Sequence, residues 1–188
     1  EQAGRLRERV VALVQSGGPK AVLASRAGNH AQGVAFAANR LGVSSTIVMP
    51  RVTPIAKVLA TEGYGAKVVL HGDFYDDAFD EAMRIQKETG AAFIHPFDDT
   101  DVIAGQATIG LEILSELADV DTVLVPAGGG GLLAGVAFAV KHINPDVKVI
   151  GVQAERADAI AQGFKRKSYV SLEDIYTIAD GIAVKKPG

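Results

Sequence analysis

The chain has 188 residues, enough for one full domain or two small lobes, and 48% of them are hydrophobic. Charged residues make up 22% and the formal net charge is -3, which excludes a disordered tail and a nucleic-acid clamp. There is no Cys, so a disulfide framework, a thiolate-bound zinc and a cysteine nucleophile are excluded. We expect a cytoplasmic globular protein without nucleic-acid or membrane partners.

The first half of the chain alternates strand-like and helix-like stretches, a rhythm typical of βαβ units. This rhythm predicts an α/β fold with a parallel sheet and helices on both faces, which makes three layers. The expected strands are Ala21–Ser25, Thr46–Met49, Lys67–Leu70 and Ala92–Ile94, and the expected helices are Asn29–Leu41, Pro54–Thr61 and Asp73–Glu88.

The second half resumes the same alternation after the acidic turn FDDTD. The residues after about 165 read as loop with one short helix or strand. We expect two open lobes, a small one over residues 1–97 that includes an N-terminal helix and a second one over residues 98–188. The expected helices of the second lobe are Val102–Leu117 and Leu132–His142, and the expected strands are Thr122–Val125 and Val147–Val152.

The loop SRAGNHAQG stands where the first strand hands over to its helix, the place where open α/β sheets bind ligands. Gly28 permits close approach of the backbone, Asn29 carries an amide that both donates and accepts, and His30 adds polar reach. A plain glycine turn with an Asn cap would also explain this loop. From the residues alone, a ligand-binding loop and a plain glycine turn with an Asn cap are equally well supported.

Four consecutive glycines, Gly128–Gly131, follow a β-branched strand and precede Leu132 and a helix. Backbone N–H groups at the start of a helix form a cradle for a phosphate. The spacing fits neither a Walker loop nor the usual dinucleotide fingerprint. A flexible loop is the alternative, but well-patterned elements on both sides make it the weaker one. Two such loops without metal-spaced His indicate a phosphorylated organic cofactor.

The chain resembles the threonine dehydratases among the fold-type II pyridoxal-phosphate-dependent enzymes, whose fold is that of the tryptophan synthase β-subunit. The matching motifs run in order from about Lys20 to the end: AGNHAQG, STIVMPRVTPIAKV, GYGAKVVLHG, HPFDDTDVIAGQATIGLEI, VLVPAGGGGLLAG, VIGVQAE and TIADGIAVKKPG. The resemblance implies pyridoxal 5'-phosphate as cofactor, a small amino acid as substrate, and β-elimination of L-threonine, and of L-serine, to a 2-oxo acid and ammonia. It also implies a homo-oligomer and a role in isoleucine biosynthesis.

The resemblance also implies roles for individual residues. Asn29 would hydrogen-bond the phenolic oxygen of the cofactor ring, and the glycine run with Leu132 would hold the phosphate. The loop around Asn29 would bind the substrate carboxylate. The residues expected at the cofactor phosphate are Gly128, Gly129, Gly130, Gly131 and Leu132, and those expected at the substrate are Ser25, Arg26, Ala27, Gly28 and His30.

Two departures from the family pattern affect the expected chemistry. The Schiff-base lysine stands in a Ser-aromatic-Lys-x-Arg-Gly stretch before the AGNH loop, and this chain has no such stretch. Lys20, Lys57 and Lys67 stand in contexts that do not match it. Arg26 occupies a position where the family carries a small hydroxyl residue beside the substrate carboxylate. An Arg there either pairs with a carboxylate or blocks the pocket.

The chain is expected to be a fragment, because it begins without Met and stops well short of the family's usual end. A truncated second lobe predicts exposed sheet edges and self-association. The chain alone is expected to be inactive. The alternatives are a serine racemase or serine dehydratase of the same fold, and a catalytically dead lobe that keeps the phosphate cradle.

No metal site is expected from the sequence. The four His residues are scattered without an i,i+4 pair. The acidic cluster of Asp98, Asp99 and Asp101 reads as a helix cap rather than a cation site. Glu155 fits the first position of a cation site found in some relatives, but the residues after it lack the required spacing.

Overall fold

The computed structural model describes residues 20–73 and 75–188. The chain divides into two compact units, the first ending at Pro96 and the second running from Phe97 to Gly188. The sequence predicts this division one residue later, after residue 97. The N-terminal helix that it expects lies outside the described residues. In the part of the chain that is described, no helix is long and apolar enough to cross a membrane.

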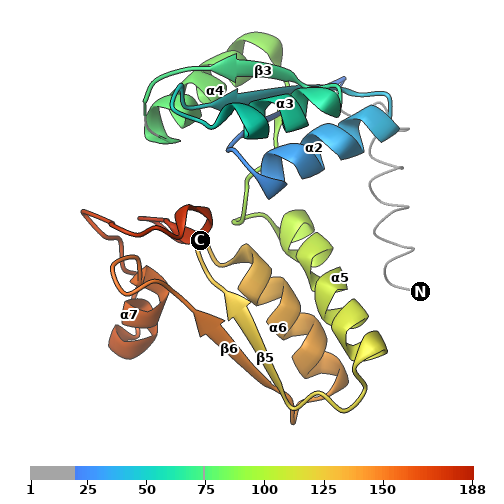
Figure 1. The fold of residues 1–188 in the computed structure, drawn as a ribbon, viewed down its shortest axis with the longest axis vertical. Helices are drawn as coiled ribbons and strands as arrows, with labels where there is room; N and C mark the ends of the chain where they lie inside the picture. Colours follow the sequence, from blue (N-terminus) through green and yellow to red (C-terminus); the bar gives the residue numbers. More distant parts are fainter. Residues whose placement is uncertain (1–19, 74) are drawn as a thin grey trace. The chain divides into compact units, whose positions relative to one another are not determined.

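The first unit contains a four-stranded parallel sheet in the order β3-β2-β1-β4. Three helices connect the strands, and Figure 1 shows α2 and α3 on one side of the sheet and α4 on the other. The strands are β1 (Ala21–Ser25), β2 (Ser44–Met49), β3 (Lys67–Leu70) and β4 (Ala92–Phe93), and the helices are α2 (Asn29–Arg40), α3 (Ile55–Gly63) and α4 (Tyr75–Thr89).

Alternate residues of β1 point to opposite faces of this sheet and enter two separate cores. Ala24 packs with Ala31 and Ala35 of α2, while Leu23 packs with Ala78 and Ala82 of α4. The facing helices place alanines against the sheet, so the layers approach closely. The first unit is therefore the expected three-layer α/β lobe, with β1 buried on both faces.

The second unit has two parallel strands, β5 and β6, covered by α6, which in turn packs against α5. Figure 1 shows α6 between α5 and the strands. The elements are α5 (Thr100–Glu116), β5 (Thr122–Pro126), α6 (Gly131–Ile143), β6 (Lys148–Val152), α7 (Ala159–Arg166) and a 3-10 turn at Asp180–Ile182.

The sheet of the second unit is buried on one face. Val123 and Val125 point toward Val136 and Val140 of α6, whereas Leu124 between them is 65% exposed. Within the described residues β5 pairs with β6 alone, so the outer edge of each strand is open. The expected exposed sheet edges are thus confirmed, and the self-association expected from them stays a prediction.

The observed elements differ from the expected ones by one or two residues at several ends, and one helix was missed. Helix α7, Ala159–Arg166, was not predicted. Its position depends on the side chain of Gln153, which accepts from the N–H of Ala161 at 2.9 Å. Strand β2 begins at Ser44, two residues before the expected start, since Ser44 and Ser45 pair with Ala21 and Val22. Strand β4 ends at Phe93, one residue early.

Candidate functional site

Helix α6 begins at Gly131, the last glycine of the run, and Gly130 is its N-cap residue. No described side chain caps it, and no acidic residue stands in its first turn. A helix leaves its first backbone N–H groups without partners inside the helix, and its dipole favours negative charge there. The sequence predicts a phosphate cradle at this point, and the local geometry has the features that such a cradle needs.

Each glycine of the run has a structural reason to lack a side chain. Gly130, at the N-cap, has φ of 101°, a left-handed conformation that side chains disfavour. A Cβ at Gly128 would lie 2.9 Å from Cα of Ile182, and one at Gly131 would lie 2.7 Å from the carbonyl oxygen of Phe97. A Cβ at Gly129 would overlap the ring carbons of Phe97. The flexible-loop alternative therefore fails, because the run is packed on several sides.

Leu132 can contribute to a bound phosphate only through its backbone. Its side chain packs against the core formed by Val123, Val125 and Val136. Ala127, just before the glycines, donates its N–H to the carbonyl of Val152 at 2.8 Å, which extends the pairing of β5 with β6. The loop thus leaves the sheet at a fixed point and enters α6 within a few residues.

The corresponding loop of the first unit joins β1 to α2. Gly28 has φ of 91°, and its carbonyl accepts the N–H of Gln32 at 3.1 Å, which opens the helix. Asn29 is exposed, and no described side chain caps α2. The Asn-cap interpretation is therefore wrong: Asn29 is the first helical residue, and its amide is available to a ligand.

The side chains around Asn29 differ in their burial and in their hydrogen bonds. His30 is half-buried, and its Nε2 hydrogen-bonds the carbonyl of Ile94 at 3.1 Å, which joins α2 to the end of β4. Ala27 packs against the core of the unit. Ser25 is fully buried, and its Oγ has no hydrogen-bond partner within the described residues. A buried hydroxyl without a partner is costly in an apolar core.

Arg26 lies against an aromatic ring that the sequence analysis did not connect with it. Its guanidinium carbon stands 6.0 Å from the centre of the Tyr75 ring, at the start of α4. Burial raises the pKa of the Tyr75 hydroxyl above its usual value, and the positive charge of Arg26 opposes part of that rise. This packing gives Arg26 a definite orientation inside the first unit.

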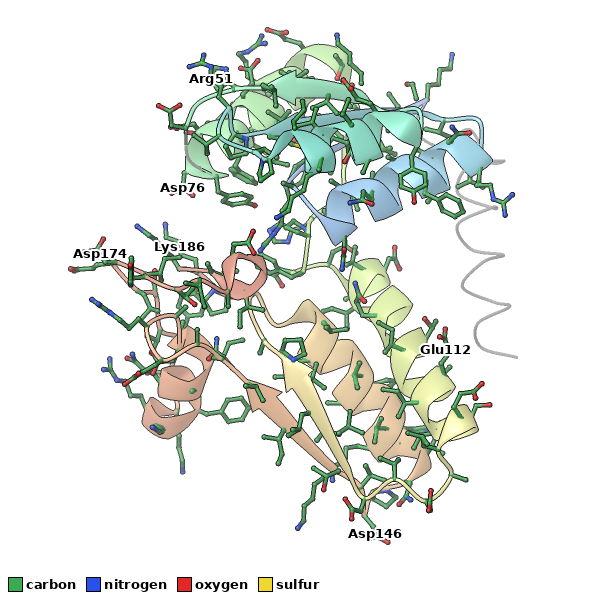
Figure 2. The ribbon with its side chains drawn as sticks, in the orientation of Figure 1. Arg51, Asp76, Glu112, Asp146, Asp174 and Lys186 are labelled. Atoms are coloured by element: carbon green, nitrogen blue, oxygen red, sulfur yellow. The ribbon has the colours of Figure 1, made fainter. Side chains whose placement is uncertain are left out.

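The lysines considered for covalent attachment are all placed by the structure. Lys20 precedes β1 and Lys67 opens β3, both exposed, while Lys57 lies half-buried in α3. Lys185 and Lys186 belong to the C-terminal segment and are exposed, and Figure 2 shows Lys186 projecting from that segment. None of these residues stands in the stretch that the family uses for attachment.

The acidic cluster before α5 acts as a helix cap, as the sequence predicts. Asp99 is the N-cap residue, and its Oδ1 accepts from the N–H groups of Asp101 at 2.8 Å and Val102 at 3.1 Å. Among the described residues, no group of three or more His, Asp or Glu side chains could hold a metal ion.

Phe97 and the segment Ile182–Gly188 contact the glycine run, and the sequence pattern did not predict these contacts. Both lie in motifs that carry the family resemblance, HPFDD and ADGIAVKKPG. The signal that could have revealed them is the glycine run itself, because buried glycines require large neighbours that fill the space.

Comparison with known proteins places the chain in a family. A family model described as pyridoxal-phosphate dependent enzyme matches residues 4–188. The chain is 54% identical over 169 residues to an L-threonine ammonia-lyase of Thermotoga maritima, which covers 90% of this chain and 42% of that protein. The chain therefore belongs to the pyridoxal-phosphate dependent enzymes, and it spans less than half the length of this relative.

Solved structures show the same fold. The processed form of threonine deaminase isoform 2 from Solanum lycopersicum matches with a TM-score of 0.86 and 44% identity, over 90% of this chain and 47% of that one. Maize serine racemase matches with a TM-score of 0.85 and 37% identity, over 90% of this chain and 51% of that one. These structures confirm the fold-type II prediction.

Proposed function

We propose that the protein from which this chain comes is a pyridoxal-phosphate-dependent ammonia-lyase that deaminates L-threonine to 2-oxobutanoate, and also accepts L-serine. The observation that carries the proposal is the N-terminus of α6, uncapped by any described side chain and preceded by tightly packed glycines. The identities to proteins named threonine ammonia-lyase and threonine deaminase support the choice of substrate.

The residues fit the phosphate of the cofactor. Backbone N–H groups of Gly128–Gly131 and Leu132 would bind it, because the helix start offers donors and positive potential without a competing acidic side chain. A Cβ at Gly128, Gly129 or Gly131 would collide with Ile182 or Phe97, and Gly130 has a positive φ, so the run carries no side chains that could cover its N–H groups. When bound, pyridoxal phosphate supplies an electron sink for the α-carbon of an amino acid.

The loop of the first unit would serve the cofactor ring and the substrate. Asn29 would hydrogen-bond the phenolic oxygen of the ring, since its amide is exposed at the start of α2. Backbone N–H groups of residues 26–30 would orient the substrate carboxylate. Arg26 would pair with the substrate carboxylate, the first of the two roles that the sequence leaves open, and its guanidinium lies over the Tyr75 ring.

The lysine that attaches the cofactor is not assigned within this chain. The test is to incubate the 188-residue chain with pyridoxal phosphate, reduce with borohydride and map the labelled peptides. We expect no single lysine to be labelled above background. Stoichiometric labelling of one lysine would contradict this expectation and would identify the attachment residue.

The proposed reaction is tested on the full-length protein. Release of 2-oxobutanoate from L-threonine and of pyruvate from L-serine would be followed by coupled reduction of the oxo acid. We expect both products, with L-threonine the better substrate. A full-length protein that binds the cofactor but releases neither oxo acid would contradict the proposal and favour a catalytically dead lobe.

A serine racemase is the second candidate, favoured by the match to the maize enzyme. Chiral chromatography of serine after incubation with the full-length protein separates the two functions. Formation of D-serine faster than pyruvate would favour the racemase, whereas oxo-acid release without D-serine favours the ammonia-lyase.

We propose further that the full-length protein works in the cytoplasm, in isoleucine biosynthesis, as a homo-oligomer. The absence of Cys agrees with a reducing compartment, and the resemblance to the family implies the oligomer. Rescue of a strain that lacks threonine deaminase on medium without isoleucine tests the pathway. Sedimentation of the full-length protein tests the oligomer.

A further inference from the structure

Phe97 is the first residue of the second unit, and two of the four glycines are packed against it. Its ring occupies the space in which a side chain at Gly129 would lie, and its carbonyl oxygen and Cα lie 2.7 and 2.9 Å from the position of a Cβ at Gly131. Both glycines are buried, and Phe97 itself is half-buried. The ring of Phe97 therefore explains why position 129 must be glycine, and the backbone of Phe97 explains why position 131 must be glycine.

The opposite side of the loop rests on the C-terminal segment, Ile182–Gly188. A Cβ at Gly128 would lie 2.9 Å from Cα of Ile182 and 3.2 Å from Cγ2 of Val184. The carbonyl of Gly129 accepts the N–H of Gly188 at 2.9 Å. The loop is thus held between Phe97 and this segment.

The C-terminal segment is itself fixed by hydrogen bonds, although most of it is irregular. The hydroxyl of Tyr169 donates to the carbonyl of Pro187 at 3.0 Å, and the N–H of Leu172 donates to the carbonyl of Lys185 at 3.0 Å. A segment anchored in this way can support the loop rather than move with it.

We propose that Phe97 is a positioning residue for phosphate binding. It holds the backbone of Gly129–Gly131 in one conformation, so the N–H groups at the start of α6 are oriented before the ligand arrives. The proposal rests on the proposed function, in which these N–H groups bind the cofactor phosphate. It adds that the glycines make room for Phe97, as well as letting the ligand approach the backbone.

The physical reason is the cost of ordering a glycine loop. Glycine loses more conformational freedom than any other residue when it is fixed, so four in a row bind a ligand weakly unless the fold has already fixed them. An acidic or hydroxyl cap would fix the start of α6, but it would also occupy the N–H groups. Packing by an apolar ring orders the backbone and leaves the donors available.

The test compares four forms of the 188-residue chain: unaltered, Phe97→Ala, Gly129→Ala, and the double variant. Affinity for pyridoxal 5'-phosphate and affinity for inorganic phosphate are both measured by the amide shifts of the loop in NMR. Stability without ligand is measured by urea unfolding. Phe138→Ala is the matched control, because Phe138 lies on α6, is 68% exposed and does not form the loop.

We expect Phe97→Ala to weaken binding of both probes by about tenfold or more, because the loop is no longer ordered beforehand. Gly129→Ala should both weaken binding and lower the urea midpoint. In the Phe97→Ala background the same Gly129→Ala change should have a much smaller effect on the midpoint, because the ring that it collides with is gone. Phe138→Ala should leave both affinities within twofold.

Phe97→Leu guards against a variant that simply fails to fold. Leu fills part of the space, so its binding should fall between that of the unaltered chain and that of Phe97→Ala. If Phe97→Ala binds both probes within twofold of the unaltered chain, the positioning role of Phe97 is overturned, but the assignment of the phosphate site is not. Additive effects of the two substitutions on the urea midpoint also overturn the positioning role.

A failure of the proposed function would give different results from a failure of the positioning role of Phe97. If the unaltered chain binds neither probe at the loop, the assignment of the phosphate site fails and the role of Phe97 in binding fails with it. If the unaltered chain binds and the variants bind equally well, the site assignment stands and the role of Phe97 is rejected.

Discussion

Two helices of the second unit begin in opposite ways. At α5, Asp99 accepts two backbone N–H groups, and Asp101 adds a second carboxylate in the first turn. At α6, Gly130 occupies the equivalent N-cap position, without a capping side chain from the described residues and without an acidic residue in the first turn. A side chain satisfies two donors of the first start, whereas no described side chain does so at the second.

Under the proposed function, the capped start contributes to stability and the uncapped start to ligand binding. A capped start contributes about 1 kcal/mol and binds nothing further. An uncapped start forgoes that stabilisation and must be held by other means, here by Phe97 and Ile182 around the glycines. Helix α2 repeats the second pattern in the first unit, where Gly28 precedes an exposed Asn29.

The largest expected effect concerns the contact that holds the two helices together. A Cβ at Gly135 of α6 would collide with the carbonyl oxygen of Ile103 and lie 2.7 Å from the amide nitrogen of Ala107, both in the backbone of α5. Gly135→Ala should therefore destabilise the chain by about 2–3 kcal/mol, measured by urea unfolding.

Gly105 of α5 provides the matched control for this substitution. It is also a helical glycine, but a Cβ there would meet no described atom within 4 Å. Gly105→Ala should raise stability by about 0.5–1 kcal/mol through helix propensity. Equal destabilisation by both substitutions would contradict the close packing of α5 against α6.

The next effect separates the two helix starts directly. Asp99→Ala removes the acceptor for two N–H groups of α5 and should cost about 1 kcal/mol of unfolding free energy, while Asp99→Asn should cost less. Affinity for pyridoxal phosphate should stay unchanged in both variants. Loss of affinity on Asp99→Ala would show that the two starts are not independent.

A carboxylate placed near the start of α6 should make this helix start more like the start of α5. Ala134 is exposed, near the N-terminus of the helix. Ala134→Glu should stabilise the helix by about 0.3–1 kcal/mol and weaken phosphate binding about threefold, through repulsion of the anion. Ala134→Gln carries no charge and is the control. Equal phosphate affinity of the two variants at low salt would argue against an anion site here.

The smallest effect tests the neighbourhood of the start of α2. The pKa of Tyr75 is raised by burial, so the hydroxyl is protonated in the folded state at a pH where the unfolded chain begins to ionise. Stability from this group is complete below the ordinary pKa of 10.0 and is lost as the pH rises through the raised value. The Tyr75→Phe variant should not lose this part of the folding stability at alkaline pH. Thermal unfolding at a series of increasing pH values measures the difference.

Much of the fold could be predicted because its signals are local. The β-branched strand Thr122–Pro126 and the helix start at Asp99 depend on neighbours in sequence, and both are close to the predictions. Helix α7 was missed although its residues are amphipathic, and the hydrogen bond that the N–H of Ala161 donates to Oε1 of Gln153 joins residues eight positions apart.

Only part of the candidate site was predictable from the sequence. The glycine run and Asn29 were recognised because glycines and polar side chains after a strand are visible in sequence. The packing of Phe97 on Gly129 and Gly131 joins residues about thirty positions apart, and no pattern in the chain specifies that contact. The same reason applies to Arg26 and Tyr75, which meet only in the folded unit.

The most direct test of the account is an NMR titration of the 15N-labelled chain with pyridoxal 5'-phosphate and with inorganic phosphate. The account predicts that both ligands shift the amide signals of Gly128–Leu132 at the start of α6 and leave those of Asp101 and Val102 at the start of α5 in place. Shifts confined to α5, or an unchanged glycine loop at saturating ligand, would contradict it.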